Sequence, residues 1–226
     1  MSKKYKKATE QVDKTKTYSL DEALELLPKV STSKFAGSVE LTINFRLNEK
    51  QKKESLRGSV VFPNSFGEGK KVLVLTDSTK QDEAKKAGAD FIGLEDLVKK
   101  IEGGWLGFDV AIATPSVMPQ IAKLGKYLGR RGLMPNPKNQ TVTNDLEKVI
   151  KMYKSGKKDF KMSEGQSIQL TIGKLDMKKE DLVANFEAFS KAISNNLKAL
   201  GSSSLKAVYL SPTMGPSVKI EPSTLG

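Results

Sequence analysis

Cysteine and histidine are both absent from this chain of 226 residues. Their absence excludes thiol nucleophiles, Ser-His triads and imidazole acid–base chemistry. It also excludes the usual zinc and haem sites, whose ligands are mostly Cys or His. The composition therefore argues against an enzyme, and we expect neither a metal nor a cofactor.

Long hydrophobic runs are missing too. No run of eighteen apolar residues occurs, so no membrane span is predicted. The first seven residues are basic, but no apolar stretch follows them, which argues against a secretory signal. We expect a soluble, cytoplasmic protein. The lysines between Lys3 and Lys7 favour a frayed, solvated tail, with a basic arm on a phosphate backbone as the alternative.

Positive charge, by contrast, is abundant. The chain has 38 Lys and Arg against 26 Asp and Glu, a net charge of +12. An excess of this size favours a polyanionic partner, of which nucleic acid is the leading candidate. At roughly 150 residues per domain, the length predicts one or two domains.

Both ends of the chain show strands with one wet face. Ser19 and Glu22 form a capping box that begins a helix, and Pro28 is expected to end it. A second helix is predicted over 179–200. Alternation of apolar and polar residues predicts half-buried strands at 38–47 and 167–172. Further strands are predicted at 59–62, 206–210 and 217–220.

The middle of the chain has a different pattern. Residues 72–75 are continuously apolar, as in a strand buried on both faces of a parallel sheet. Further strands are predicted at 91–92 and 108–113, alternating with helices at 81–87, 94–101, 121–128 and 146–153. This alternation predicts a doubly wound α/β unit.

The fold class we expect combines α/β and α+β domains. Residues 1–66 and 160–226 are each thin for a core of their own, so we expect them to form one discontinuous α+β domain that holds both termini. Residues 67–159 form the inserted, Rossmann-like α/β domain between them. The glycine- and charge-rich crossings suit a hinge.

A nucleotide-binding enzyme is the alternative that the inserted domain raises, because doubly wound sheets often bind nucleotides. No G-x-G-x-x-G follows Leu75, and Gly67-Glu-Gly-Lys70 precedes that strand instead of following it. Asp77 and Asp109 are isolated carboxylates that we interpret as cap or turn residues. The signal for an enzyme is weak.

Two other segments are candidates for binding RNA. Residues 123–138 hold three glycines, two prolines and five cations, which suits close approach to phosphates or, equally, a basic solvated loop. Residues 213–217 offer hydroxyls around Gly215 and Pro216, which could bind RNA by shape and 2′-hydroxyl contacts. Taken alone, residues 213–217 more often indicate a plain hairpin connection. Phe35, beside Lys34, is either an exposed ring or part of the core.

Together these segments resemble the family of large-subunit ribosomal protein one, bacterial type. The strongest match is Leu128-Gly-Arg-Arg-Gly-Leu-Met-Pro-Asn-Pro-Lys138, and 104–115 is similar to the stretch that the family has upstream. Lys34-Phe35, Leu56-Arg-Gly58 and Tyr209–Ser217 match further landmarks in order, so the resemblance covers about 18–222.

The resemblance implies a non-catalytic, two-domain constituent of the large ribosomal subunit. It implies binding to 23S rRNA at the mobile stalk, near the E site, where stalk movement accompanies release of deacylated tRNA. It also implies repression of translation through the protein's own operon mRNA. The expected partners are thus the ribosome, its 23S rRNA, E-site tRNA and that mRNA, with no membrane and no small-molecule substrate. A free RNA-binding repressor outside the ribosome would use the same face and remains an alternative.

The resemblance also implies which residues bind RNA. The main set is Lys34, Phe35, Ser38, Glu40, Thr42, Arg57, Thr213, Met214, Gly215 and Ser217. Arg57 could be a phosphate contact or a structural residue. The secondary basic loop, which comprises Lys126, Arg130, Arg131 and Lys138, is a candidate from its composition. The chain departs from the family at Arg130, usually proline, at Asn64, often histidine, and at Glu68, often lysine. Ser38 stands where many members have threonine, which keeps the hydroxyl.

Overall fold

The computed structural model describes residues 3–47, 56–67, 69–163, 165–200 and 204–225. Contacts divide the chain into two compact units. The terminal unit comprises Met1–Phe66 and Asp159–Gly226, and the inserted unit comprises Gly67–Lys158. Both mix helices and strands, which confirms the predicted α/β and α+β class. Glu68 lies outside the described residues.

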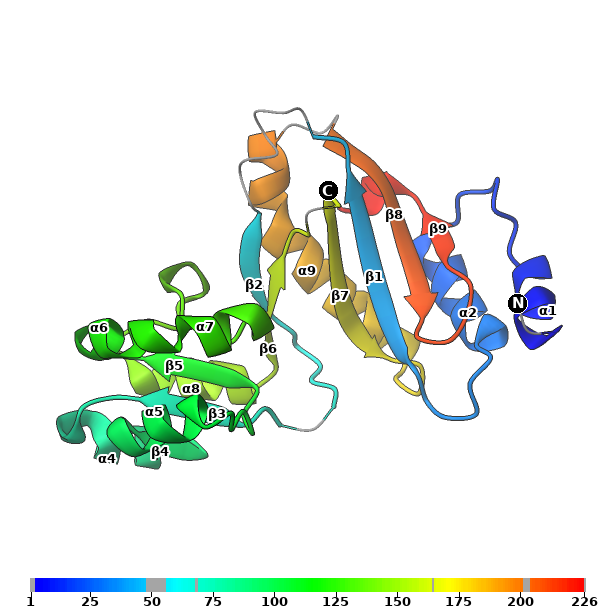
Figure 1. The fold of residues 1–226 in the computed structure, drawn as a ribbon. Helices are drawn as coiled ribbons and strands as arrows, with labels where there is room; N and C mark the ends of the chain where they lie inside the picture. The colour runs from blue at the N-terminus through cyan, green and yellow to red at the C-terminus, as the bar shows by residue number, and fades with distance from the viewer. Residues whose placement is uncertain (1–2, 48–55, 68, 164, 201–203, 226) are drawn as a thin grey trace. The chain divides into compact units, whose positions relative to one another are not determined.

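A four-stranded antiparallel sheet organises the terminal unit (Figure 1). Its strands, in spatial order, are β7 (Ser167–Lys174), β1 (Ser38–Phe45), β8 (Leu205–Pro212) and β9 (Val218–Ile220). Leu41 of β1 lies opposite Leu170 on one side and Leu210 on the other. Because side chains alternate between the two faces of a strand, this register places all three on the same face.

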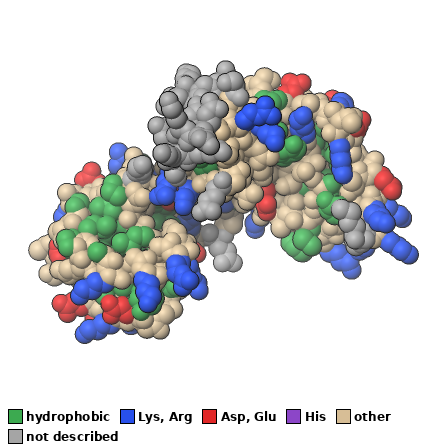
Figure 2. Space-filling model, turned by 45° about the horizontal axis from the view of Figure 1, so that its top comes forward, with side chains coloured by type: hydrophobic (Ala, Val, Ile, Leu, Met, Phe, Trp, Pro, Cys, Tyr) green, Lys and Arg blue, Asp and Glu red, His purple; other side chains and the backbone are tan. Residues whose placement is uncertain are grey.

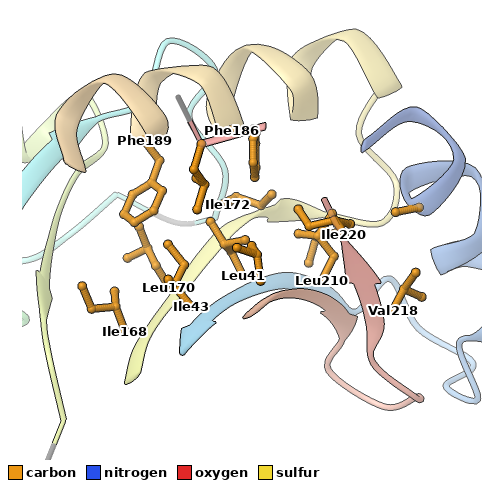
Figure 3. Close-up of a cluster of buried hydrophobic side chains, with 14 of the residues drawn as sticks. Leu41, Ile43, Ile168, Leu170, Ile172, Phe186, Phe189, Leu210, Val218 and Ile220 are labelled. Atoms are coloured by element: carbon orange, nitrogen blue, oxygen red, sulfur yellow. The ribbon is translucent and has the colours of Figure 1, made fainter. Parts of the chain in front are cut away.

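Helices cover that apolar face. The long helix α9 (Lys179–Leu200) and the shorter α2 (Leu20–Val30) both contribute to the core, and Figure 3 shows the apolar side chains between α9 and the strands. Phe186 and Phe189 of α9 are almost fully buried there. The opposite face carries the polar residues of the alternating pattern, such as Glu40 and Thr42, and these are only half-buried. The predicted wet face of the sheet is therefore present.

Two expectations about the N-terminal helices are wrong. Lys3–Glu10 forms a helix, α1, instead of a frayed tail, because Ala8 and nearby Val12 are buried against the core. The second helix begins at the predicted capping box but continues through Pro28 to Val30. The amide of Ser31 donates to the carbonyl of Leu27 at 3.1 Å, which closes a last turn that buries Val30.

A separate two-stranded sheet pairs β2 (Arg57–Val61) with β6 (Lys157–Lys161). The sequence did not predict β6, since four of its five residues are charged and it shows no alternating pattern. Its one aromatic residue, Phe160, packs edge-on against Phe189, with ring centroids 5.3 Å apart. A Cβ at Gly58 would lie 2.5 Å from Phe160 Cζ, so only glycine fits opposite this ring.

The inserted unit is built on three parallel strands in the order β4 (Phe91–Gly93), β3 (Val72–Leu75) and β5 (Val110–Ala113). One face packs against α4 (Gln81–Lys86) and α8 (Leu146–Lys154). The other packs against α5 (Glu95–Glu102), α6 (Met118–Ile121) and α7 (Gly125–Leu128). Helices on both faces of a parallel sheet make the unit doubly wound, as predicted.

The continuous helix predicted over 121–128 is broken in the structure. A 3-10 turn at Ala122–Leu124 separates α6 from α7, and a second at Gly129–Arg131 follows α7. Gly125 and Gly129 favour this break, because glycine costs up to about 1 kcal/mol relative to alanine inside a helix. Other short 3-10 turns lie at Ser78–Lys80, Pro115–Val117, Pro137–Asn139 and Pro222–Leu225. Within the described ranges, no helix is long and apolar enough to cross a membrane.

Candidate nucleic-acid interface

Two loops that are far apart in the sequence lie side by side at one end of the four-stranded sheet (Figure 1). One precedes β1 and the other joins β8 to β9. The amide and the hydroxyl of Thr32 both donate to the carbonyl oxygen of Met214, each at 2.8 Å. We call residues 32–38 together with residues 213–217 the loop surface. It brings together seven of the predicted RNA-binding residues: Lys34, Phe35, Ser38, Thr213, Met214, Gly215 and Ser217.

Thr213 fixes the first residue of β1. The amide of Ser38 donates to Thr213 Oγ1 at 2.9 Å, and the amide of Thr213 donates to the Ser38 carbonyl at 3.0 Å. The hydroxyl hydrogen of Thr213 has two acceptors within reach, the Ser38 carbonyl at 3.2 Å and Glu40 Oε1 at 3.4 Å. Thr213 therefore positions the loop surface, and its hydroxyl keeps one lone pair for a ligand.

Two large apolar side chains project from the loop surface into solvent. Phe35 is 66% exposed and Met214 is 53% exposed. Phe35 is thus an exposed ring and not a core residue. The hydroxyl of Ser33 donates to the Phe35 carbonyl at 2.8 Å, which holds the backbone that carries this ring. An aromatic ring and a thioether on a rigid backbone suit contact with a base or a ribose.

Gly215 is required by close packing of the backbone. A Cβ at this position would lie 2.6 Å from Pro212 Cγ and 2.8 Å from the carbonyl oxygen of Val30. Real Cβ atoms do not approach so closely, so any side chain here would push the β8–β9 loop away from the end of α2. The glycine thereby sets the position of Met214.

The polar face of the sheet continues from the loop surface. Glu40 lies between Thr171 and Ser211, and Thr42 lies between Gln169 and Tyr209. These neighbours are polar or aromatic, and Lys219 lies opposite Tyr209 on β9. Sequence reasoning missed Thr32, Tyr209 and Lys219 as members of this region. Strand alternation could have indicated the last two, but nothing in the sequence links Thr32 to Met214.

Other candidate residues lie elsewhere. Arg57 is exposed at the start of β2, in the two-stranded sheet that packs against α9, so the structure does not bring it to the loop surface. The secondary basic loop belongs to the inserted unit. Lys126 lies in α7, Arg130 and Arg131 in the turn after it, and Lys138 in the turn Pro137–Asn139.

The loop surface has one charged residue, Lys34, so charge does not set it apart. Lys and Arg side chains are spread over the visible face of both units in Figure 2, with acidic side chains among them. The net charge of +12 therefore provides general attraction to a polyanion. Selectivity for one RNA over other polyanions has to come from the uncharged groups of the loop surface and from the shape of its backbone.

Nucleotides bind at the carboxyl ends of the strands in doubly wound sheets. In this sheet, side chains that follow β3 and β5 are hydrogen-bonded to one another there. Ser116 Oγ donates to Asp77 Oδ2 at 2.7 Å and lies 3.1 Å from Thr114 Oγ1. Thr114 is fully buried. Asp109 accepts the amide of Lys71 at 2.8 Å, as expected of a turn residue. Among the described residues, no group of three or more Asp or Glu side chains could hold a metal ion.

Comparisons with known proteins agree with the resemblance in the sequence. Residues 27–216 match the Ribosomal protein L1p/L10e family. The chain is 40% identical over 224 residues to large ribosomal subunit protein uL1 of Lactobacillus acidophilus, covering 99% of this chain and 97% of that one. It is 41% identical over 229 residues to uL1 of Streptococcus thermophilus, covering 99% and 98%. It is 43% identical over 227 residues to uL1 of Thermosipho melanesiensis, covering 99% and 97%.

Matches of this extent and identity establish the family. The chain belongs to the Ribosomal protein L1p/L10e family. Because this is a family of structural ribosomal proteins, the expectation that the chain is not an enzyme is confirmed.

Proposed function

We propose that this protein is a constituent of the large ribosomal subunit that binds 23S rRNA through the loop surface, at the mobile stalk near the E site. The observation that carries the proposal is the pair of exposed apolar side chains, Phe35 and Met214, held on two loops that Thr32 joins. Exposed apolar side chains that gather on one surface, unlike ones scattered singly, mark interaction sites.

Folded RNA fits this surface by its chemistry. Unstacked bases at a helical junction can stack on Phe35, while ribose and the minor groove present 2′-hydroxyls to backbone and hydroxyl groups. Lys34 is exposed beside Phe35 and can contact a phosphate. The apolar and backbone contacts then select the RNA, and Lys34 and other cations provide affinity that falls as the salt concentration rises.

Glu40 is the one acidic side chain in the proposed set, and a carboxylate repels phosphate. It lies within 3.4 Å of the Thr213 hydroxyl, on the half-buried polar face. There it can accept a hydrogen bond from a 2′-hydroxyl or from an exocyclic base amine, as acidic side chains do at cytosine. We assign Glu40 to binding such a donor, and Thr42, two residues along the strand on the same face, to the edge of the same contact.

The finer steps of the function follow from the family resemblance. In this account the protein acts in the cytoplasm, its bound stalk moves as deacylated E-site tRNA leaves the ribosome, and the loop surface also binds the protein's own operon mRNA to repress translation. Since one surface serves both RNAs, the rRNA and the mRNA compete for it. A stalk-rRNA fragment should therefore displace a labelled mRNA leader from the protein.

Binding of a stalk-rRNA fragment to Met214→Asp tests the assignment of the surface. The variant places a carboxylate at the exposed tip, and we expect at least about fivefold weaker binding, or 1 kcal/mol. Val61→Asp is the matched control, because Val61 is 45% exposed but lies on β2, away from the loop surface. Equal affinity of Met214→Asp and Val61→Asp would contradict the assignment.

A further inference from the structure

The inserted unit contains a long segment without acidic residues. From Val110 to Asn144 there is no Asp or Glu, although the chain holds 26 of them elsewhere. The same segment has five cations: Lys123, Lys126, Arg130, Arg131 and Lys138. The structure shows which of them share a surface.

Buried leucines fix the orientation of α7 and the turns on either side of it. Leu124 and Leu128 are fully buried in the core beneath β5, together with Ile121. Five residues between and just after these buried positions are exposed: Lys123, Lys126, Tyr127, Arg130 and Arg131. We call these five the tyrosine surface. Side chains three or four positions apart on a helical segment are neighbours, so each of the four cations lies beside Tyr127 or beside a cation that does.

Tyr127 is 38% exposed, which makes it one of four large hydrophobic side chains exposed among the described residues. Two others, Phe35 and Met214, belong to the loop surface. The backbone next to Tyr127 is open as well. A Cβ at Gly125 or at Gly129 would meet no atom within 4 Å, so a ligand can approach the backbone on both sides of the ring.

The cations of the tyrosine surface are not held by carboxylates in the described part of the chain. The inserted unit forms its ion pairs elsewhere, between Lys85 and Asp82, Lys151 and Glu147, and Lys154 and Asp90. Four exposed cations around one aromatic ring, with no acid near them in sequence, present strong attraction to phosphate and a flat platform for a base.

We propose that the tyrosine surface is a second RNA-binding site, which stacks an unpaired base on Tyr127 and binds the flanking phosphates with its Lys and Arg side chains. Single-stranded or looped RNA is the ligand class, because a regular duplex keeps its base faces stacked and offers only phosphates and groove edges to such a surface. The proposal rests on the proposed function only in taking RNA as the partner. It does not require the loop surface, and it gives the chain two separable RNA contacts.

Fluorescence anisotropy with the full chain tests the proposal. The probes are a labelled 12-nucleotide single-stranded RNA and a duplex of the same sequence. Tyr127→Ala should weaken binding of the single strand roughly tenfold, since one base stacked on an aromatic side chain contributes about 1–3 kcal/mol. Tyr127→Phe keeps the ring and should bind within twofold of the wild type. The affinity for the duplex should be the same in all three proteins.

The arginines give an independent readout. The double variant Arg130→Gln with Arg131→Gln should reduce the slope of log affinity against log salt by up to about 1.4 for the single strand, or 0.7 per phosphate. Far-ultraviolet circular dichroism and a thermal melt establish that each variant is folded. Tyr127→Ala that binds the single strand as the wild type does would overturn the proposal. So would an equal loss for single strand and duplex, which would mean contact with phosphates alone.

Failure here is distinguishable from failure of the proposed function. Tyr127→Ala should leave affinity for the stalk-rRNA fragment unchanged, and Met214→Asp should leave the tenfold difference between wild type and Tyr127→Ala on the single strand unchanged. If Met214→Asp does not weaken stalk binding but Tyr127→Ala weakens single-strand binding, the loop-surface assignment fails and the second site stands. If the reverse holds, the second site fails.

Discussion

Asn185 holds the backbone of Asn64 from both sides. Its Nδ2 donates to the Asn64 carbonyl at 3.0 Å, and its Oδ1 accepts the Asn64 amide at 3.1 Å. The same Nδ2 also donates to the Ile172 carbonyl of β7 at 2.8 Å. Asn185 is fully buried in α9, so one side chain satisfies three backbone groups that link this helix, the sheet and the segment after β2. These contacts are to the backbone at residue 64, so they do not depend on its side chain, whose own bond, from Nδ2 to the Asp181 carbonyl, is long at 3.5 Å.

Replacing Asn185 with Leu should destabilise the protein. The change leaves the amide and carbonyl of Asn64 and the carbonyl of Ile172 without their partner. Each buried group left unsatisfied costs about 1–3 kcal/mol, and better burial of Leu offsets part of this. We expect the free energy of unfolding to fall by about 3 kcal/mol in urea titrations. Asn64→Ala keeps the backbone groups and should cost under about 1 kcal/mol. A larger loss for Asn64→Ala would refute this explanation.

Gly215→Ala should distort the loop surface. The new Cβ would lie 2.8 Å from the Val30 carbonyl oxygen and 2.6 Å from Pro212 Cγ. Overpacking of this kind costs about 1–3 kcal/mol, measured as a lower midpoint of thermal unfolding. Because Met214 moves with the loop, affinity for stalk rRNA should also fall. Gly129→Ala is the control, since its Cβ would meet no atom within 4 Å and its backbone is helical. Equal stability of both variants would count against the packing argument.

Lys158 should make stability depend on pH in the alkaline range. Burial, and then the charge of Lys70, lower the pKa of Lys158 to about 8 from its ordinary value of 10.5. Between these two values the unfolded chain binds more protons than the folded one, so the contribution of Lys158 to stability rises with pH. Relative to Lys158→Met, the wild type should therefore gain stability from about pH 8 to pH 10.5. Parallel urea curves for the two proteins at pH 7, 8, 9 and 10 measure this, and a constant difference would disprove it.

Local sequence patterns predicted most of the fold. The capping box at Ser19 and the strict alternation along β1 depend on neighbouring residues, and the sequence displays both directly. Strand β6 was missed because its charged residues are held by distant partners: Lys157 is 2% exposed, and its Nζ donates to the Asn139 carbonyl at 3.1 Å. Pro28 was expected to end a helix that the burial of Val30 continues. Tertiary contacts decided both cases, and no local pattern reports them.

The candidate site, too, could be predicted from the sequence only in part. The family resemblance indicated Thr213, Met214 and Gly215, but the reason for each became visible only in the structure. Thr213 holds Ser38, and Gly215 fits against Val30. Thr32 was missed because the contact that makes it important joins residues 182 positions apart. Whether Phe35 is exposed was open in the sequence, since an aromatic residue before a strand occurs in both settings.

Co-sedimentation with large ribosomal subunits is the sharpest test of whether this protein binds the subunit through the loop surface. Subunits stripped of this protein are mixed with wild type, Met214→Asp or Val61→Asp and centrifuged through a sucrose gradient at physiological salt. We expect wild type and Val61→Asp to migrate with the subunits to the same extent, and a clearly smaller share of Met214→Asp to do so. Wild type that remains at the top, or Met214→Asp that migrates as fully as the wild type, would contradict this account.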